Sequence, residues 1–218
     1  MDSPDEPLHI VAPAAQFVSR AGHKLDGALD VFGVDVQGRT AIDVGASTGG
    51  FTDCLLQRGA ASVVALDVGY GQLHERLRTD DRVTVVERTN VRHADALELG
   101  APFSIVVADL SFISLRTVAL ALASLGDDST DWLLLVKPQF EAGRDAVGRG
   151  GIVRESSIWT QVLFEVHDGL SDVGLGCHGL EVSSIRGSEG NVEFVGYYRK
   201  APGIVTAEQI DDVVRAAS

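Results

Sequence analysis

Thr40-Ala-Ile-Asp-Val-Gly-Ala-Ser-Thr-Gly-Gly-Phe-Thr52 is the stretch from which the fold of this chain can be worked out. Its first half is a short apolar run, typical of a strand buried in a parallel sheet, and we expect a strand over Thr40–Gly45. The glycines that follow let the backbone turn sharply and approach a ligand closely. We expect a helix over Gly50–Arg58. A strand, a glycine-rich turn and a helix in this order indicate the first unit of a doubly wound α/β sheet.

Short β-branched runs and amphipathic stretches alternate along the rest of the chain. We expect further strands over Ser62–Val68, Val83–Glu87, Ser104–Asp109, Trp132–Lys137, Leu180–Ile185 and Asn191–Tyr198, and further helices over Arg20–Phe32, Gln72–Arg78, Ser114–Ser124 and Glu155–Val173. The first five strands are apolar nearly throughout, as parallel strands buried on both faces are. The last two are joined by a short segment containing Gly-Ser-Glu-Gly, which suits an antiparallel pair. The sequence therefore predicts a Rossmann-like α/β fold, with a mostly parallel seven-stranded sheet and a terminal antiparallel hairpin.

Length and composition bound the class of protein. A chain of 218 residues, 45% of them apolar, suits one soluble domain. We assign residues 17–218 to this domain and residues 1–16, with three prolines, to a flexible lead-in. No apolar run is long enough to cross a membrane and the acidic N-terminus is unlike a signal peptide, so we expect a cytoplasmic protein. Two cysteines cannot form a disulfide framework, and no CxxC pair or histidine cluster indicates a metal.

The net charge of −13 bears on the class of partner. Strong non-specific binding to nucleic acid depends on a basic surface, so we expect the isolated chain to bind RNA weakly. An RNA substrate is still compatible with this charge, because a local basic face on an acidic protein can suffice.

The glycine-rich turn indicates the class of cofactor. A nicotinamide-binding turn reads GxGxxG, whereas this chain has GxxxGG at Gly45, Gly49 and Gly50. Asp43 would repel a pyrophosphate, but it suits the cationic amino-acid end of S-adenosylmethionine. Asp67 lies 22 residues after Gly45, where an acidic side chain binds the ribose hydroxyls of an adenosine cofactor. A turn that only connects strand to helix is the alternative, and the two acids together argue against it.

The cofactor prediction extends to the residues around these three positions, with Asn90 facing the adenine edge. The complete predicted set is Asp43, Gly45, Ala46, Ser47, Thr48, Gly49, Gly50, Phe51, Asp67, Val68, Asn90 and Asp109.

Three charged residues from distant segments are expected to meet at one edge of the sheet. Asp109 ends the fourth strand, Lys137 ends the fifth, and Glu193 lies near the start of the last. The carboxyl ends of parallel strands form the ligand crevice of an open α/β sheet, and an antiparallel last strand would start at that same edge. Lys24, on the first helix, could cover the crevice.

Lys137 directly follows Leu-Leu-Leu-Val, and a lysine there is costly unless it is paired or used. It could form a structural ion pair with Asp109 or Glu193, or act as general base for a weakly acidic hydroxyl. The two roles are compatible, because acidic neighbours would hold the ammonium group while burial favours its neutral form. A sulfonium methyl donor is already activated, so an enzyme must align the acceptor oxygen and remove a proton. A set of two lysines and two carboxylates can do both.

Seven segments of the chain together resemble one family. They are Ser19-Arg-Ala-Gly-His-Lys-Leu25, Asp43 to Thr52, Asp67-Val-Gly-Tyr-Gly-Gln-Leu73, Glu87-Arg-Thr-Asn90, Asp109-Leu-Ser-Phe-Ile-Ser-Leu115, Lys137-Pro-Gln-Phe-Glu141 and Gly190-Asn-Val-Glu193. In this order, the segments resemble the TlyA (hemolysin A) family of ribosomal RNA 2′-O-methyltransferases, in the FtsJ-like group.

The resemblance implies a class I methyltransferase fold, S-adenosylmethionine as cofactor, and ribosomal RNA within ribosomal subunits as partner, with cytidine as the target. It implies a catalytic tetrad of Lys24, Asp109, Lys137 and Glu193. Family members usually begin with a small basic RNA-binding domain of the S4 type. This chain shows none, and its opening resembles the tail of that domain and the linker.

Three other functions remain open at this point. A membrane-active haemolysin would fit the family's older name, but the acidic chain offers no strongly basic amphipathic helix. A methyltransferase acting on a small molecule or a protein differs only in substrate, and the tetrad favours a ribose hydroxyl by resemblance alone. A binding module that has lost catalysis is disfavoured by the complete tetrad.

Overall fold

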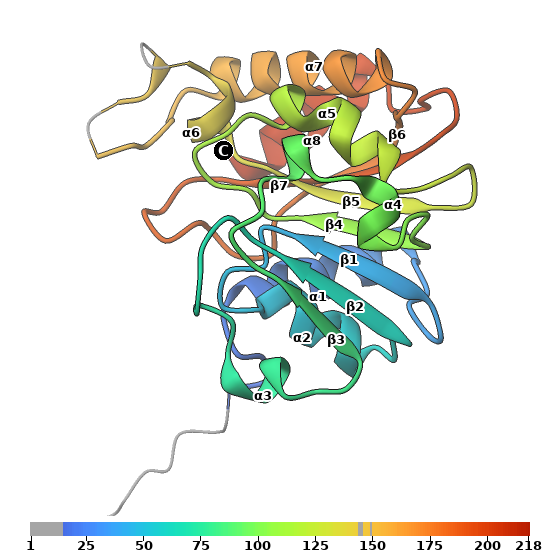
Figure 1. The fold of residues 1–218 in the computed structure, drawn as a ribbon. Coiled ribbons are helices and arrows are strands. Elements are labelled where there is room, and N and C mark those ends of the chain that lie inside the picture. Colours follow the sequence, from blue (N-terminus) through green and yellow to red (C-terminus); the bar gives the residue numbers. More distant parts are fainter. Residues whose placement is uncertain (1–14, 144–145, 149) are drawn as a thin grey trace, which may run out of the picture.

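A computed structural model of the chain describes residues 15–143, 146–148 and 150–218. The expected lead-in over residues 1–16 falls almost wholly outside this part. The domain that follows is built on one sheet with helices on both faces (Figure 1).

The sheet has seven strands in the order β3-β2-β1-β4-β5-β7-β6. Their bounds are β1 Thr40–Val44, β2 Ser62–Leu66, β3 Val83–Val86, β4 Ile105–Ala108, β5 Asp131–Val136, β6 Gly176–Val182 and β7 Phe194–Arg199. The pairs among β1 to β5 are parallel, and β7 runs antiparallel to both β5 and β6. The predicted fold class is confirmed, with β7 inserted between β5 and β6.

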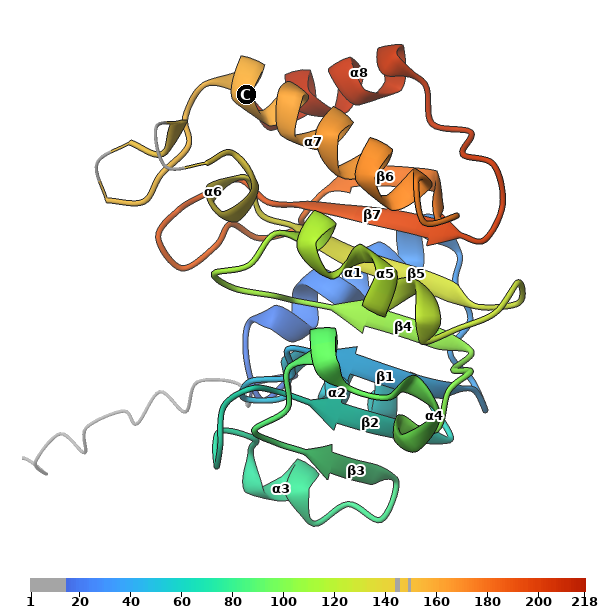
Figure 2. The same cartoon turned by 45° about the horizontal axis from the view of Figure 1, so that its top comes forward.

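The strands supply two cores, one on each face of the sheet. Successive side chains of a strand point to opposite faces. Trp132 and Leu134 therefore pack in the core under α5 (Leu115–Ser124), α7 (Ser156–Ser171) and α8 (Ala207–Ala217), while Leu133 and Leu135 belong to the core under α1 (Ala21–Phe32) and α2 (Gly50–Gln57). Figure 2 shows the two helix layers. This explains why the first five strands are apolar at nearly every position. Trp132 is completely buried and its indole N–H donates to the carbonyl of Leu122 at 3.0 Å, so its polar atom is satisfied.

The five predicted helices are present, and within the described residues three further helices and a 3-10 turn were not expected. Their bounds are α1 Ala21–Phe32, α2 Gly50–Gln57, α3 Glu75–Arg78, α4 Ala96–Leu99, α5 Leu115–Ser124, α6 Pro138–Glu141, α7 Ser156–Ser171 and α8 Ala207–Ala217, with a 3-10 turn η1 at Val91–His93. Helix α3 is shorter than the expected Gln72–Arg78, because His74 caps it and accepts from the backbone N–H of Arg76.

Helix α8 was not expected, although the sequence carries its signal. Thr206 and Gln209 form a reciprocal capping box at its start, and Ile210 and Val214 are buried one turn apart. Helix α8 packs on α7 and β6 and completes the core on that face.

The two C-terminal strands have different bounds from those expected. Strand β6 begins at Gly176 rather than Leu180. The prediction missed this start because glycine is a weak strand signal and a register shift between Cys177 and Gly179 interrupts the alternation of side chains. Strand β7 begins at Phe194 rather than Asn191. The Asn191 side chain instead binds the backbone of Gly151 and Val153, which holds the preceding residues out of the ladder.

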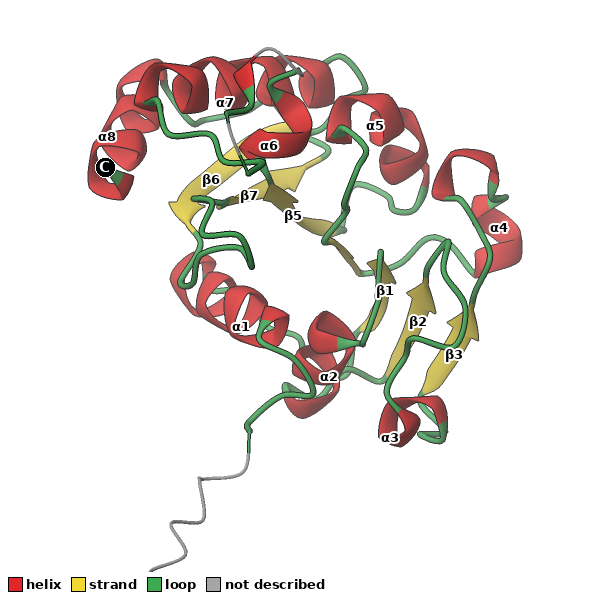
Figure 3. Cartoon of the chain, turned by 90° about the vertical axis from the view of Figure 1, so that its left-hand side faces the viewer, coloured by secondary structure: helices red, strands yellow, loops and turns green. Residues whose placement is uncertain are grey.

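The loops that follow the parallel strands gather at one edge of the sheet, which Figure 3 shows from the front. Because β7 is antiparallel, its first residue pairs with the last residue of β5, Val136. The loop before β7 therefore lies at the same edge as the ends of β1, β4 and β5. All the predicted catalytic strand ends meet there.

Candidate active site

The turn after β1 is built for close approach. Gly45 has φ 89°, and a Cβ atom there would lie 2.8 Å from the backbone oxygen of Asp109. Only glycine therefore allows β1 and β4 to lie together at this point. Ser47 also adopts a left-handed φ of 49°, which is uncommon for a residue with a side chain. This conformation lets its backbone N–H donate to the Asp67 carboxylate at 2.8 Å.

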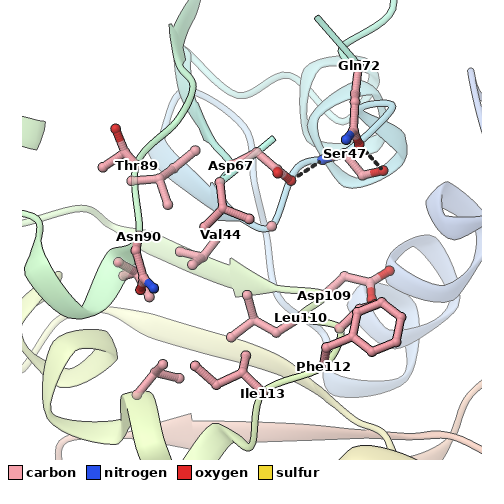
Figure 4. A pocket seen from close by; sticks show the side chains of 16 residues that line it. Val44, Ser47, Asp67, Gln72, Thr89, Asn90, Asp109, Leu110, Phe112 and Ile113 are labelled. Carbon is pink, nitrogen blue, oxygen red and sulfur yellow. Dashed lines mark hydrogen bonds between the residues drawn. The ribbon is translucent and has the colours of Figure 1, made fainter. Parts of the chain in front are cut away.

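A cavity of about 520 Å³ opens beside this turn. Asp67, at its wall, accepts from the backbone N–H groups of Ser47 and Gly69 at 2.8 and 2.6 Å, one on each carboxylate oxygen (Figure 4). Each oxygen keeps a lone pair for a further donor, such as a ribose hydroxyl. The cavity size and this oriented carboxylate fit the adenosine part of the expected cofactor.

Only part of the predicted cofactor set lines this cavity. The lining residues from that set are Gly45, Ser47, Asp67, Val68, Asn90 and Asp109. Asn90 uses its side-chain oxygen to cap η1, which leaves its amide nitrogen for a ligand. Ala46, Thr48, Gly49, Gly50 and Phe51 shape the turn and the start of α2 without lining the cavity. Thr89, Ser111, Phe112 and Ile113 do line it and were not predicted.

Asp43 has no exposed surface. One of its carboxylate oxygens accepts from the backbone N–H and the hydroxyl of Thr52, at 2.9 and 2.7 Å, and so caps α2. Its other oxygen is buried and has no hydrogen-bond partner among the described residues. Burial raises the pKa of Asp43 to about 7. A cationic group beside the free oxygen would stabilise the charged form.

The four predicted catalytic residues form two buried ion pairs. Lys24 on α1 contacts Glu193 with an N–O distance of 2.5 Å, and Lys137 contacts Asp109 at the same distance. Lys137 also donates to the hydroxyl of Ser111 at 3.1 Å. The open choice of partner for Lys137 is thus settled in favour of Asp109.

Gln139 lies two residues after Lys137, on the short helix that Lys137 caps, and contacts the other ion pair. Its amide N–H donates to the second carboxylate oxygen of Glu193 at 3.3 Å. Its own carbonyl oxygen is buried and has no partner within the described part of the chain. Sequence reasoning noted Gln139 only as part of the Lys-Pro-Gln-Phe-Glu segment, since an uncharged side chain gives no strong signal.

Glu141 holds the loop between β4 and α5. It accepts from the Ser114 hydroxyl and the Leu115 backbone N–H, at 2.5 and 2.7 Å, and burial raises its pKa. On this loop Phe112 has a left-handed φ of 64° and a 90% exposed side chain, with its ring 5.0 Å from that of Phe140. An exposed aromatic ring therefore lies beside Asp109, at the mouth of the cavity (Figure 4).

Comparisons with known proteins agree with this geometry. The model of the FtsJ-like methyltransferase family matches residues 17–200. The chain belongs to this family. The FtsJ-like chain is 46% identical over 202 residues to the 16S/23S rRNA (cytidine-2′-O)-methyltransferase TlyA of Mycobacterium tuberculosis, covering 92% of this chain and 75% of the relative. It is 39% identical over 184 residues to Hemolysin A of Brachyspira hyodysenteriae, covering 84% and 77%.

A solved structure from Streptococcus thermophilus that carries the name hemolysin has the same fold as this FtsJ-like methyltransferase. The TM-score is 0.89 at 45% identity, covering 93% of this chain and 74% of that one. Within the described residues, no helix is long and apolar enough to cross a membrane.

Proposed function

We propose that this FtsJ-like methyltransferase transfers the methyl group of S-adenosylmethionine to a ribose 2′-hydroxyl of ribosomal RNA, with cytidine as the target. The observation that carries the proposal is the two buried lysine–carboxylate contacts, one of which adjoins the cavity through Asp109. An FtsJ-like enzyme with such a site can bind a neutral hydroxyl and remove its proton. The name of the M. tuberculosis relative supports ribosomal RNA and cytidine as substrate.

Different residues would hold the different parts of S-adenosylmethionine. Asp67 would hold the ribose hydroxyls and Asn90 the adenine, while Gly45 allows close approach of the backbone. Asp43, behind the turn, would stabilise the cationic amino-acid end. When bound, S-adenosylmethionine supplies a methyl group already activated by its sulfonium. The protein therefore has to position an acceptor oxygen and take its proton.

In this proposal, one ion pair removes the proton and the other positions the acceptor. Lys137 in its neutral form would accept the proton of the acceptor hydroxyl at Nζ, and Asp109 would stabilise the ammonium group that results. Lys24 and Glu193 lie on the other side of Gln139 and orient the ribose through hydrogen bonds. Phe112 presents an exposed ring at the cavity mouth, against which a nucleobase can stack.

The decisive experiment is methyl transfer from labelled S-adenosylmethionine to ribosomal subunits that lack the modification, followed by alkaline hydrolysis of the RNA. A 2′-O-methyl group removes the hydroxyl that attacks the neighbouring phosphodiester. We therefore expect the label in alkali-resistant dinucleotides, and mapping should place it at cytidine. Label released in mononucleotides would identify a base methyltransferase, and label in protein would overturn the RNA proposal.

Glu193→Gln is a suitable negative control, because amide and carboxylate have the same shape while the ion pair with Lys24 is lost. A second control replaces Lys200, which lies beyond the opposite end of β7, by glutamine. We expect the first variant to lose transfer and the second to retain it.

A further inference from the structure

The arginines of this acidic protein fall into two groups. Thirteen arginines lie in the described part of the chain, and eight of them pair with a carboxylate. No ion pair is found there for the other five, which are Arg20, Arg88, Arg92, Arg154 and Arg186. With 31 acidic residues against 18 basic ones, carboxylate partners are abundant. Five exposed arginines without such a partner therefore require an explanation.

All five lie on segments at the active-site edge of the sheet. Arg88 and Arg92 follow β3, and Arg88 stacks on the Tyr70 ring. Arg20 precedes α1, Arg154 precedes α7, and Arg186 lies in the loop between β6 and β7. This distribution leaves positive charge around the site of an otherwise negative molecule.

Three of these arginines lie on segments that hydrogen bonds join into one surface. The guanidinium of Arg20 donates to the backbone oxygen of Arg186 at 3.1 Å, and the Ser184 hydroxyl donates to the backbone oxygen of His23 at 2.9 Å. On the other side, Asn191 accepts from the backbone N–H of Val153, next to Arg154, at 2.9 Å.

The same bonds place this surface beside the catalytic pair. Glu193, two residues beyond Asn191, holds Lys24 of α1. Arg20, Arg154 and Arg186, which we call the arginine rim, therefore lie on the three segments that enclose Glu193 and Lys24. Figure 3 shows these segments together at the front edge, on the side of α1 and α6.

We propose that the arginine rim binds the RNA phosphates that flank the methylated ribose. The inference rests on the proposed function and adds the residues that hold the substrate backbone. Guanidinium groups match phosphate oxygens in charge and geometry, and such contacts position a strand without reading its sequence. Glu155 and Glu189 are exposed on the same segments and keep the rim from being uniformly basic. The rim thus adds to binding without making the chain a general RNA-binding protein.

The test measures the salt dependence of binding to a fluorescein-labelled twelve-residue oligocytidine RNA in KCl. Each phosphate contact on a single strand contributes about 0.7 to the slope of log K against log salt. Replacing one rim arginine by glutamine should therefore lower the slope by about 0.7 and weaken binding about fivefold at 0.1 M KCl. The triple variant should lose about 100-fold on the same basis. Arg154→Gln is the cleanest single change, since no hydrogen bond is found for its side chain among the described residues.

Lys200→Gln is the matched control. Lys200 has no carboxylate partner in the described structure, but it lies at the opposite edge and donates to the backbone oxygen of Gly126 at 2.9 Å. We expect this variant to keep the full slope. Cofactor affinity and melting temperature should be unchanged in Arg154→Gln, which separates phosphate binding from a structural role.

Three outcomes would overturn the proposal that the arginine rim binds RNA phosphates. They are an unchanged slope in the triple variant, an equal loss in Lys200→Gln, and no binding of the oligocytidine by the wild type at 20 mM KCl. Binding of polyglutamate of equal charge as tightly as RNA would assign the surface to acidic peptides instead. Methyl transfer to ribosomal subunits is measured in parallel. RNA methylation with unaltered KM in rim variants rejects the rim alone, whereas a rim-dependent slope without any RNA methylation rejects the proposed function alone.

Discussion

Replacement of Lys137 by arginine and by alanine separates proton transfer from ion pairing. Lys137 contacts Asp109 at 2.5 Å, with side chains 10% and 16% exposed. Removing one partner of a buried pair costs about 3–5 kcal/mol, and we expect about 3 here because both groups retain some solvent. For a chain of this size, each kcal/mol lowers Tm by about 2–4 °C, so Lys137→Ala should melt about 6–12 °C lower. Lys137→Arg keeps a cation against Asp109 and should melt near the wild type.

The methyl-transfer rates of the two variants should not follow their melting temperatures. A positioned general base contributes about 10²–10⁴-fold, or about 2.7–5.5 kcal/mol of activation free energy. Both variants should lose about this much in single-turnover methyl transfer, because a guanidinium stays protonated and cannot accept the proton. Each variant is first checked for cofactor affinity and for its melting curve.

The double variant Lys137→Met with Asp109→Asn supplies the control for the unpaired carboxylate. It should recover much of the stability lost in Lys137→Ala and none of the rate. Near-wild-type transfer by Lys137→Arg would refute the base assignment, since only charge would then be needed at this position. The proton would instead pass to Lys24 or to a water held by the carboxylates.

Three further predictions concern the surrounding residues. Asp67→Ala should weaken cofactor binding by about 1.5–3 kcal/mol in calorimetry, the range for hydrogen bonds to a charged group, and an unchanged affinity would exclude Asp67 from the ribose site. Because the pKa of Asp43 is raised to about 7, the folded state holds its proton across the window from about 4 to 7 and stability falls as pH rises through it. Unfolding by urea at pH 5 and pH 7.5 should therefore show a smaller pH difference in Asp43→Asn than in the wild type, and equal differences would contradict the assignment. Gln139→Glu, which places a second carboxylate against Glu193, should lower kcat about tenfold with unchanged cofactor affinity, roughly the 1.4 kcal/mol of one displaced hydrogen bond, whereas a pure KM effect would point to substrate binding instead.

The sheet was accessible from sequence because burial on both faces leaves a continuous apolar run. Trp132 to Val136 is such a run, and the structure buries every one of these side chains. Helix α8 was missed because its buried positions are few and lie among charged residues. The start of β6 was missed because its residues carry weak strand propensity, and cross-strand pairing overrides it.

The positions of the site residues could be predicted only where the order and direction of the strands determine them. Strand ends and strand order place Asp109, Lys137 and Glu193 at one edge, and the ion pair of Lys137 with Asp109 follows from adjacent strands. No sequence pattern shows that Phe112 is exposed in a left-handed conformation, because Glu141 imposes the loop from another element. The hydrogen bond from Gln139 to Glu193 spans 54 residues and depends on the loop geometry before β7.

The insertion of β7 between β5 and β6 determines the order in which the sheet can be completed during synthesis. A chain emerging from the ribosome exposes β5 as an open sheet edge, and β6 has no place in the sheet until β7 arrives. Glu193, the partner of Lys24, is synthesised only just before that last strand. The catalytic centre can therefore form only once β7 has been synthesised. A nascent or prematurely terminated chain that ends before β7 lacks the complete sheet that positions Glu193, and quality control can remove it before it acts on any substrate.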